Sequence, residues 1–165
     1  MKRLLFICLA LILTGVTVFT TSCLKDNTDA CQASAISAAA PASEIADVQS
    51  YLSSNGITAT QHSSGFFYVT SGTATGSVPG QCSRISVRYT GRLTSGTIFD
   101  QASSTVNFFL YELISGWRIG LPLISAGQNI RLYLPPSLGY GNRQAGSVPP
   151  NSILIFDIEL VAVGN

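Results

Sequence analysis

The fold of this chain is decided by the stretch Val87-Arg88-Tyr89-Thr90-Gly91-Arg92-Leu93, which Gly96-Thr97-Ile98-Phe99-Asp100 closely follows. Apolar and polar residues alternate through residues 83–93, and this two-residue period predicts a half-buried strand. Residues 94–97 have the composition of a tight turn, and extended structure is expected to resume at Ile98.

Aromatic residues and glycines continue in a definite order through the second half of the chain, at Gly116-Trp117, Gly139-Tyr140-Gly141 and Phe156-Asp157. No His or Cys follows Cys82, so this half has neither soft metal ligands nor a His- or Cys-based catalytic group. The pattern predicts an aromatic hollow with one carboxylate, Asp100, and we expect no metal and no cofactor. Such a site recognises or reshapes an apolar group and does not attack a bond.

The rest of the periodicity predicts short strands and two helices. A helix of about a dozen residues is expected to begin at Ser43, as its cap, and to stop at Asn55-Gly56. A second helix is expected over residues 112–119. The expected strands cover residues 65–70, 83–93, 98–99, 106–110, 127–134 and 153–163. Together these elements predict an α+β fold in which a sheet wraps over a helix.

Several residues receive structural interpretations. The apolar face of the first helix either binds a partner or packs on the main domain, and we favour packing. Asp157 and Glu159 are expected to be solvated or paired with Arg84 or Arg88. Core positions are assigned to four phenylalanines, Phe66, Phe67, Phe108 and Phe109.

The N-terminus has the pattern of a secretion signal, because a basic Met1-Lys2-Arg3 precedes an apolar run over residues 4–18. Ser22 immediately before Cys23 resembles a bacterial lipoprotein cleavage site, which predicts a lipid on Cys23. The alternative is an ordinary signal peptide with an incidental Cys. The following Leu24-Lys25-Asp26-Asn27-Thr28-Asp29 is faintly similar to the short tags of Lys and acidic residues that some Bacteroidetes lipoproteins use for surface export.

Export also bears on the chemical state expected for each cysteine. Cys8 leaves with the signal, whereas Cys31 and Cys82 remain in an oxidising setting that favours a disulfide. This bridge would close a loop of about fifty residues and stabilise the fold by roughly 4 kcal/mol, and two free thiols are the alternative. The expected organisation is a signal peptide at residues 1–22, a tether at 23–42, a helix-and-strand extension at 43–80 and the main domain at 81–165.

Charge excludes two kinds of partner. Without Lys2 and Arg3, seven basic residues face eight acidic ones, so the exported chain has a net charge of −1. There is no basic stripe for nucleic acid and no polybasic patch for anionic lipid. Membrane attachment would therefore come from the lipid on Cys23.

Taken in order, the motifs resemble those of the FKBP-type peptidyl-prolyl isomerases, over about residues 81–163. Each motif alone is weak evidence, whereas the ordered set at matching spacing is specific. The matching motifs are residues 87–93, Gly96-Thr97-Ile98-Phe99-Asp100, Leu113-Ile114-Ser115-Gly116-Trp117, Gly127-Gln128, Leu138-Gly139-Tyr140-Gly141 and residues 148–160.

This resemblance implies a curled antiparallel sheet of about five strands over one short helix, with a pocket between them. Trp117 would form the floor under a proline ring, while the Ile114 N–H and the Tyr140 hydroxyl would donate to substrate carbonyls. The residues that the resemblance places at the catalytic centre are Tyr89, Phe99, Asp100, Trp117, Tyr140 and Phe156. Those it assigns to further substrate contacts are Val106, Leu113, Ile114 and Val148.

Isomerisation of an X–Pro bond suits residues of these types. Amide resonance creates a barrier of about 18–20 kcal/mol, and no bond is broken when the peptide rotates. Twisting the bond localises the nitrogen lone pair, and a water-poor aromatic cavity should favour that less charge-separated state. Asp100 is expected to orient Tyr89 or to polarise the hollow, not to transfer protons.

The sequence also departs from the family pattern. Val106 stands where many members have a third pocket Phe, and residues 101–105 lack the Arg that often pairs with the pocket acid. The links near Tyr111 and at residues 142–147 are shortened. These departures bear on catalytic strength and on binding of macrolide drugs more than on the fold.

Three classes of function fit these observations: an isomerase that assists the folding of exported proteins, a weakly active peptide-binding or chaperone module, and a structural envelope lipoprotein. The retained aromatic residues argue against the third. We expect a monomer that binds proline-containing polypeptides and no nucleic acid. We expect its lipid to anchor it in the bacterial cell envelope, at the outer membrane, facing the periplasm or the cell surface.

Overall fold

The computed structural model describes residues 36–164 of the chain. The expected signal peptide, the expected lipid site Cys23 and the expected bridge partner Cys31 lie outside the described residues, as does most of the tether. Between residues 36 and 164, no helix is both long enough and apolar enough to cross a membrane.

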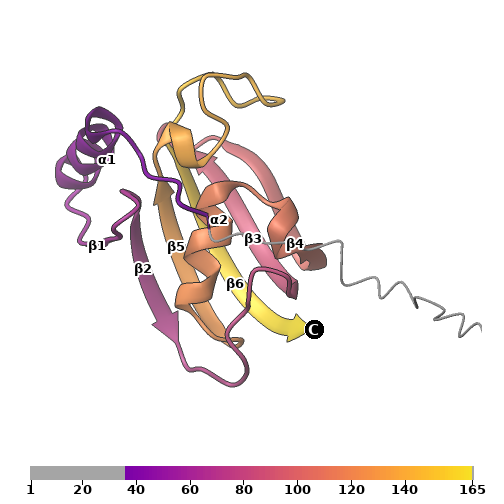
Figure 1. Cartoon of the computed structure of the whole chain (residues 1–165). Coiled ribbons are helices and arrows are strands. Elements are labelled where there is room, and N and C mark those ends of the chain that lie inside the picture. Colours follow the sequence, from indigo (N-terminus) through magenta and orange to yellow (C-terminus); the bar gives the residue numbers. More distant parts are fainter. Residues whose placement is uncertain (1–35, 165) are drawn as a thin grey trace, which may run out of the picture.

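A six-stranded, wholly antiparallel sheet forms the centre of the protein (Figure 1), in the order β1-β2-β5-β6-β3-β4. This confirms the prediction of an α+β fold with a curled antiparallel sheet, to which a two-residue strand is added at one edge. The strands are β1 (Thr60–Gln61), β2 (Phe67–Gly72), β3 (Arg84–Leu93), β4 (Ile98–Phe109), β5 (Gln128–Leu134) and β6 (Leu154–Gly164).

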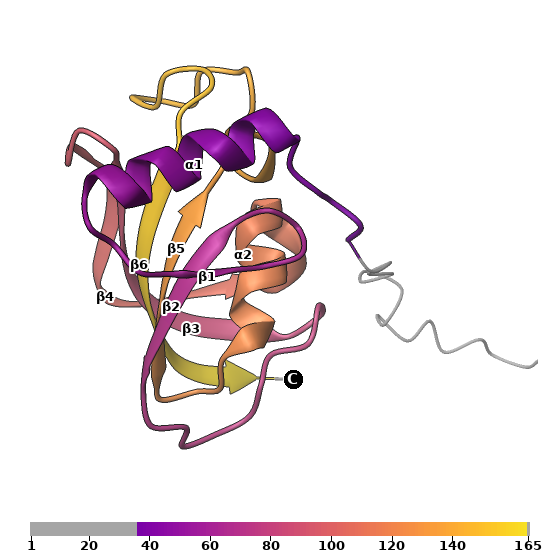
Figure 2. The ribbon, with the colours of Figure 1, turned by 90° about the vertical axis from the view of Figure 1, so that its left-hand side faces the viewer.

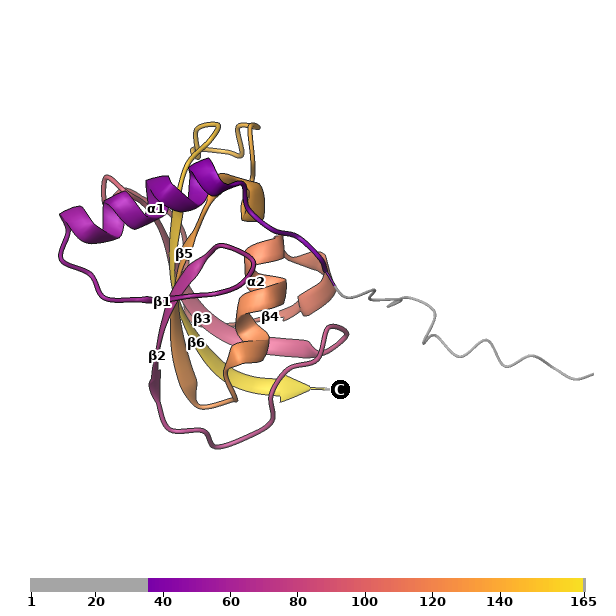
Figure 3. The ribbon, with the colours of Figure 1, turned by 60° about the vertical axis from the view of Figure 1, so that its left-hand side comes forward.

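Two α-helices lie on opposite faces of this sheet, as Figures 2 and 3 show. They are α1 (Ala42–Ser54) and α2 (Ser115–Gly120), and the 3₁₀ turns η2 (Leu110–Glu112), η3 (Leu121–Leu123) and η4 (Pro136–Leu138) lie between strands. The expected capping role of Ser43 was wrong. Pro41 occupies the position before the first helical residue, which places Ser43 inside the first turn.

Alternation along the central strands separates two apolar layers. On β5, Leu132 and Leu134 belong to the larger core beneath α2, while the intervening Tyr133 packs with Val48 and Leu52 of α1. A strand exposes successive side chains on opposite faces, so one strand serves both layers. The interpretation of the first helix as a packing element is thereby confirmed.

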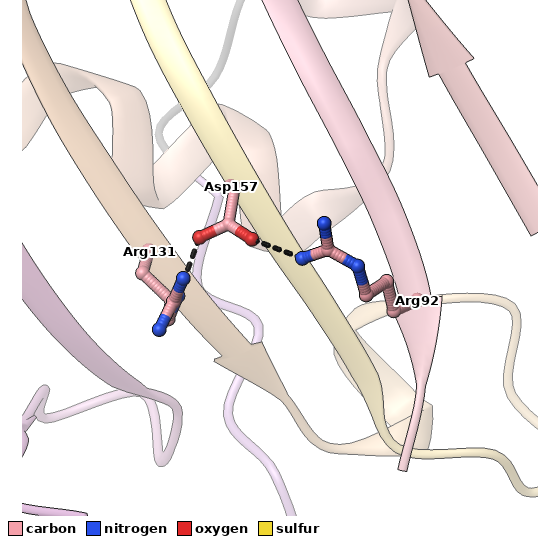
Figure 4. Close-up of polar contacts among 3 residues, drawn as sticks. All are labelled: Arg92, Arg131 and Asp157. Atoms are coloured by element: carbon pink, nitrogen blue, oxygen red, sulfur yellow. Dashed lines mark hydrogen bonds and ion pairs between the residues drawn. The ribbon is translucent and has the colours of Figure 1, made fainter. Parts of the chain in front are cut away.

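The outer face of the sheet also carries ion pairs (Figure 4). Asp157 on β6 lies between Arg131 of β5 and Arg92 of β3 and is paired with both. Glu159 is paired with Arg88, as expected, whereas Asp157 has other partners than the two arginines expected. All these side chains are about a third to a half exposed, so each pair contributes little to stability.

Strand β4 differs from the expectation of two short strands, because it runs without interruption for twelve residues. Between the pairs Val87–Val106 and Tyr89–Ala102, β4 has three residues and β3 has one, so the extra length of β4 is taken up in a β-bulge. The four phenylalanines assigned to the core divide accordingly. Phe66 and Phe67 are buried, but Phe109 is 41% exposed, and Phe108 is only partly buried.

Cys82, just before β3, is disulfide-bonded. Its expected partner Cys31 lies outside the described residues, so the pairing of these two cysteines remains a prediction.

Helix α2 packs so closely on β5 that glycine is required at its contact point. A Cβ atom at Gly116 would overlap the Leu134 side chain. We therefore expect Gly116→Ala to lower the free energy of unfolding by about 1–3 kcal/mol, the usual cost of overpacking a core. The midpoint of urea unfolding measures this change.

Gly80→Ala is the matched control, because a Cβ there would meet nothing closer than Ser83 Oγ at 3.8 Å. Leu134→Val should partly restore the stability of Gly116→Ala by making room. Equal urea midpoints for Gly116→Ala and Gly80→Ala would contradict the close packing.

Candidate functional site

A cavity of about 150 Å³ lies between the curled sheet and α2. Its walls come from β3, β4 and β6, from the segment leading into α2, from α2 itself and from the loop after η4. The lining residues are Tyr89, Asp100, Phe108, Leu113, Ile114, Trp117, Tyr140 and Phe156.

Trp117 forms one wall of an aromatic box, in which three other rings stand edge-on or tilted to one another. The indole meets Tyr89 at 5.2 Å, Phe156 at 5.3 Å and Phe108 at 6.5 Å between ring centroids, with interplanar angles of 86–89°. Edge-to-face geometry is favoured by the ring quadrupoles, so the four rings stabilise one another in this arrangement. The box is therefore a preformed apolar surface shaped for a small, flat apolar ring.

Gly91 explains how the neighbouring aromatic residues reach this position. It lies in the middle of β3, opposite Asp100 of β4 on one side and Phe156 of β6 on the other. A Cβ atom at Gly91 would come within 2.7 Å of Phe99 and 2.9 Å of Phe156. With glycine there, these two rings meet edge-to-face at 5.5 Å, and Phe99 supports Phe156 from behind the cavity.

The polar edge of the cavity consists of one carboxylate and two phenols. The Tyr89 hydroxyl donates to Asp100 Oδ2 at 2.7 Å. Burial raises the pKa of Tyr89 most, and the hydrogen bond and negative charge of Asp100 raise it further. Burial and then the charge of Asp100 also raise the pKa of Tyr140. Both phenols therefore keep their protons at neutral pH and act as donors.

Two further donors at the cavity have no acceptor within residues 36–164. The Ile114 N–H precedes the first turn of α2, where backbone N–H groups lack helical partners. The Tyr140 side chain is 37% exposed, and its hydroxyl likewise donates to no described residue. A carbonyl-bearing chain that entered the cavity would therefore find two unoccupied donors beside an apolar box.

The Tyr140 loop is fixed at its base from two directions. The Gly141 N–H donates to the Pro136 carbonyl at 2.8 Å, and the Asn151 N–H donates to the Gly141 carbonyl at 2.8 Å. On the other side, Glu44 of α1 accepts from the Ser137 N–H at 2.9 Å. The N-terminal helix thus contacts the segment that presents Tyr140.

Seven of the ten site residues expected from the sequence lie around this cavity, and three do not. Phe99 stands behind Phe156, Val148 is 2% exposed within the core, and Val106 packs against the core from β4. The seven that the structure brings together are Tyr89, Asp100, Leu113, Ile114, Trp117, Tyr140 and Phe156.

Phe108 is the lining residue that sequence reasoning missed. Val106 and Phe108 are two residues apart on β4 and therefore share the inner face, and Phe108 is the one that reaches Trp117. Phe108 thus adds an aromatic wall to those expected, and the correspondence of Val106 with a third pocket Phe of the family stays a prediction. The two-residue period of the strand was visible in the sequence, but it places Val106 and Phe108 on the same face and does not tell which of them reaches the cavity.

A second, wider hollow of about 780 Å³ lies on the outer face of the sheet. Its walls include the paired side chains of Arg88 and Glu159 and of Arg131 and Asp157. An apolar ring would gain little there, because the groups it would cover are already ion-paired and in contact with water. The smaller aromatic cavity is therefore the better candidate site.

Known proteins resemble this chain in sequence and in structure. The sequence model of the FKBP-type peptidyl-prolyl cis-trans isomerases matches residues 76–161. The chain is similar to the FKBP-type peptidyl-prolyl cis-trans isomerase FkpA of Aeromonas hydrophila, with 37% identity over 122 residues, which are 70% of this chain and 45% of that protein. It is also similar to the outer membrane protein MIP of Legionella longbeachae, with 38% identity over 104 residues, 61% of this chain and 45% of that protein.

Among solved structures, the protein is similar to a peptidyl-prolyl cis-trans isomerase from Pseudomonas syringae pv. tomato. The TM-score is 0.66 at 32% identity, and the match covers 76% of this chain and 98% of that chain. The two curated relatives are longer, and the match spans less than half of the length of each.

The environment of Tyr89 predicts a specific response to loss of the carboxylate. Asp100→Asn should lower the pKa of Tyr89, because it removes a negative charge and a strong acceptor. Burial, the larger cause, persists, so that pKa should still exceed the ordinary 10.0. Alkaline titration of the tyrosine ζ-carbon resonances by NMR measures the change.

Because the pKa of Tyr89 is raised in the folded state, its contribution to stability is complete below pH 10.0 and declines as pH rises further. Asp47→Asn, on the exposed side of α1, is the control and should leave the titration of Tyr89 unaltered. An identical Tyr89 titration in Asp100→Asn and the wild type would contradict the proposed coupling.

Proposed function

This chain belongs to the FKBP-type peptidyl-prolyl cis-trans isomerase family, and from that premise we propose that it isomerises X–Pro bonds in exported polypeptides. The observation that carries the proposal is the aromatic box, with Trp117 edge-on to three other rings and two unoccupied donors beside it. The cavity binds a proline ring on the indole and leaves the flanking peptide carbonyls at its polar edge.

The mechanism needs no nucleophile and no proton transfer. The Ile114 N–H and the Tyr140 hydroxyl hold substrate carbonyls on either side of the prolyl bond, which fixes the chain while the bond rotates. Rotation removes amide resonance and localises the nitrogen lone pair, a state that an apolar cavity stabilises relative to the planar, charge-separated amide. Asp100 holds the Tyr89 ring in the wall through the hydroxyl bond at 2.7 Å.

A second candidate function is a peptide-binding or chaperone module of the same fold with weak isomerase activity. The observation that favours it is the setting of Asp100. This residue is exposed, and among the described residues its side chain is hydrogen-bonded to Tyr89 alone. A carboxylate held by one neutral partner positions the wall less firmly than one held by an arginine as well.

We further propose the organisation and location of the chain. Residues 81–165 act as the isomerase domain, residues 43–80 as its extension, and the protein works as a monomer on proline-containing chains. Residues 1–22 are a lipoprotein signal peptide, 23–42 a tether, and the lipid on Cys23 anchors the protein in the bacterial cell envelope, at the outer membrane. The similarity to an outer membrane protein of Legionella longbeachae supports an envelope location.

The isomerase proposal predicts that residues 24–165, which keep Cys31 but lack the lipid site, accelerate the proline-limited refolding of a test protein, which is slow without a catalyst. Asp100→Val should reduce the acceleration by about tenfold, equivalent to about 1.4 kcal/mol of transition-state stabilisation. Trp117→Leu should reduce it at least as much, since it removes the floor of the box.

Asp47→Val makes the same side-chain change on the exposed face of α1 and should refold the test protein at the wild-type rate. Circular dichroism of each variant at the assay temperature separates loss of activity from loss of fold. Equal refolding rates with and without the wild-type domain would refute the isomerase proposal and leave the binding module.

The anchor proposal predicts that the full chain, expressed in a lipoprotein-processing bacterium, fractionates with membranes. Cys23→Ser should move it to the soluble fraction, because a lipid chain supplies the membrane affinity. Mass spectrometry of the mature N-terminus should find lipid on Cys23, with Cys31→Ser as the control that retains it. An uncleaved or unmodified Cys23 would refute the anchor.

A further inference from the structure

The last turn of α2 contains a carbonyl that the helix itself cannot satisfy. In an α-helix the carbonyl of residue i accepts from the N–H of residue i+4, so the partner of the Arg118 carbonyl would be residue 122. That residue is Pro122, which has no N–H and whose ring crowds the carbonyl four residues earlier.

The backbone continues as a helix up to this proline. Gly120 (φ −77°, ψ −41°) and Leu121 (φ −64°, ψ −32°) both have helical dihedral angles. Residue 122 is thus carried to the place from which an N–H would reach the Arg118 carbonyl. An N–H at residue 122 is the α-helical donor that the Arg118 carbonyl lacks, and the proline removes it.

Gln81 supplies the missing donor from outside the helix. Its Nε2 donates to the Arg118 carbonyl at 2.8 Å, across 37 residues of sequence. The Oε1 of the same amide is buried with no hydrogen-bond partner in the described part of the chain. The bond to Arg118 is therefore the single described hydrogen bond of this side chain.

The segment that carries Gln81 is itself fixed. The Ser83 carbonyl accepts from the Leu110 N–H at 3.0 Å, at the start of the turn that leads into α2. Cys82 between them is disulfide-bonded. Residues 81–83 therefore hold the polypeptide both before α2 and at its last turn.

Trp117 directly precedes Arg118 in this six-residue helix. So short a helix has few hydrogen bonds of its own, and its position depends on the contacts that surround it. We propose that Gln81 is a positioning residue: by replacing the donor that Pro122 lacks, it fixes the last turn of α2 and thereby the Trp117 floor of the cavity. Its effect on catalysis rests on the proposed function, whereas its effect on Trp117 does not.

The test uses Trp117 as its own reporter, because it is the one tryptophan in the chain. Gln81→Met keeps the side-chain length but removes the amide donor. We expect acrylamide to quench Trp117 fluorescence more strongly, and KM for a proline-containing tetrapeptide to rise about fivefold with a smaller change in kcat, as loss of one hydrogen bond implies.

The rescue variant is Gln81→Met with Pro122→Ala, which restores a backbone N–H at residue 122. Quenching and KM should return toward the wild-type values. Gln49→Met on the exposed face of α1 is the matched control and should change neither. If Gln81→Met alone does not fold, recovery of folding in the double variant supports the proposal, and failure to recover overturns it.

Wild-type quenching in a folded Gln81→Met, or an effect of Gln81→Met that Pro122→Ala leaves unrelieved, would overturn the proposal. Absence of isomerase activity in the wild type would refute the proposed function instead, and the quenching comparison would still decide the role of Gln81.

Discussion

The close contact between α2 and β5 is the constraint on which the rest of the structure depends. Gly116 and Gly120 are four residues apart and lie on one face of the helix, against Leu134 and Leu132 of β5. Any side chain at these glycines would push the helix outward. Because they have none, Trp117 is held close enough to the curled sheet for β3, β4 and β6 to surround its indole.

The absence of a side chain also explains the packing on the other side of the cavity. Gly91 on β3 lets Phe99 and Phe156 meet above it, so the wall is two rings deep at this point. Polar groups enter only at the rim, where burial and Asp100 keep the phenols of Tyr89 and Tyr140 protonated. The cavity is therefore an apolar box with donors at its edge, which suits recognition of a proline ring and rotation of its peptide bond.

Elements that precede β3 in the chain contribute to this arrangement. Helix α1 covers the outer face of the sheet through Val48 and Leu52, and its Glu44 accepts from the backbone of η4 below Tyr140. Gln81 reaches the last turn of α2 in a similar way. In both cases a side chain from before β3 satisfies a backbone group of a short helical turn next to the cavity, where the turn has no partner of its own.

The sequence by itself determined most of the strands, the two apolar layers and most of the aromatic residues from which the cavity is built. Period-two alternation in β3 and β6, and the glycine–aromatic pairs Gly116-Trp117 and Gly139-Tyr140, are local patterns that can be read from the sequence without a structure. These patterns also led to the family, because the order and spacing of motifs can be read from the sequence without a structure.

Only the tertiary structure decided which side chains meet. Val106 and Phe108 share one face of β4, and only the structure shows that Phe108 is the one whose ring meets the indole. Asp157 pairs across two strands with Arg92 and Arg131, a choice set by strand order and not by sequence distance. The donor to the Arg118 carbonyl is a further example. Pro122 shows in the sequence that a backbone donor is missing, but only the tertiary structure shows that Gln81 replaces it.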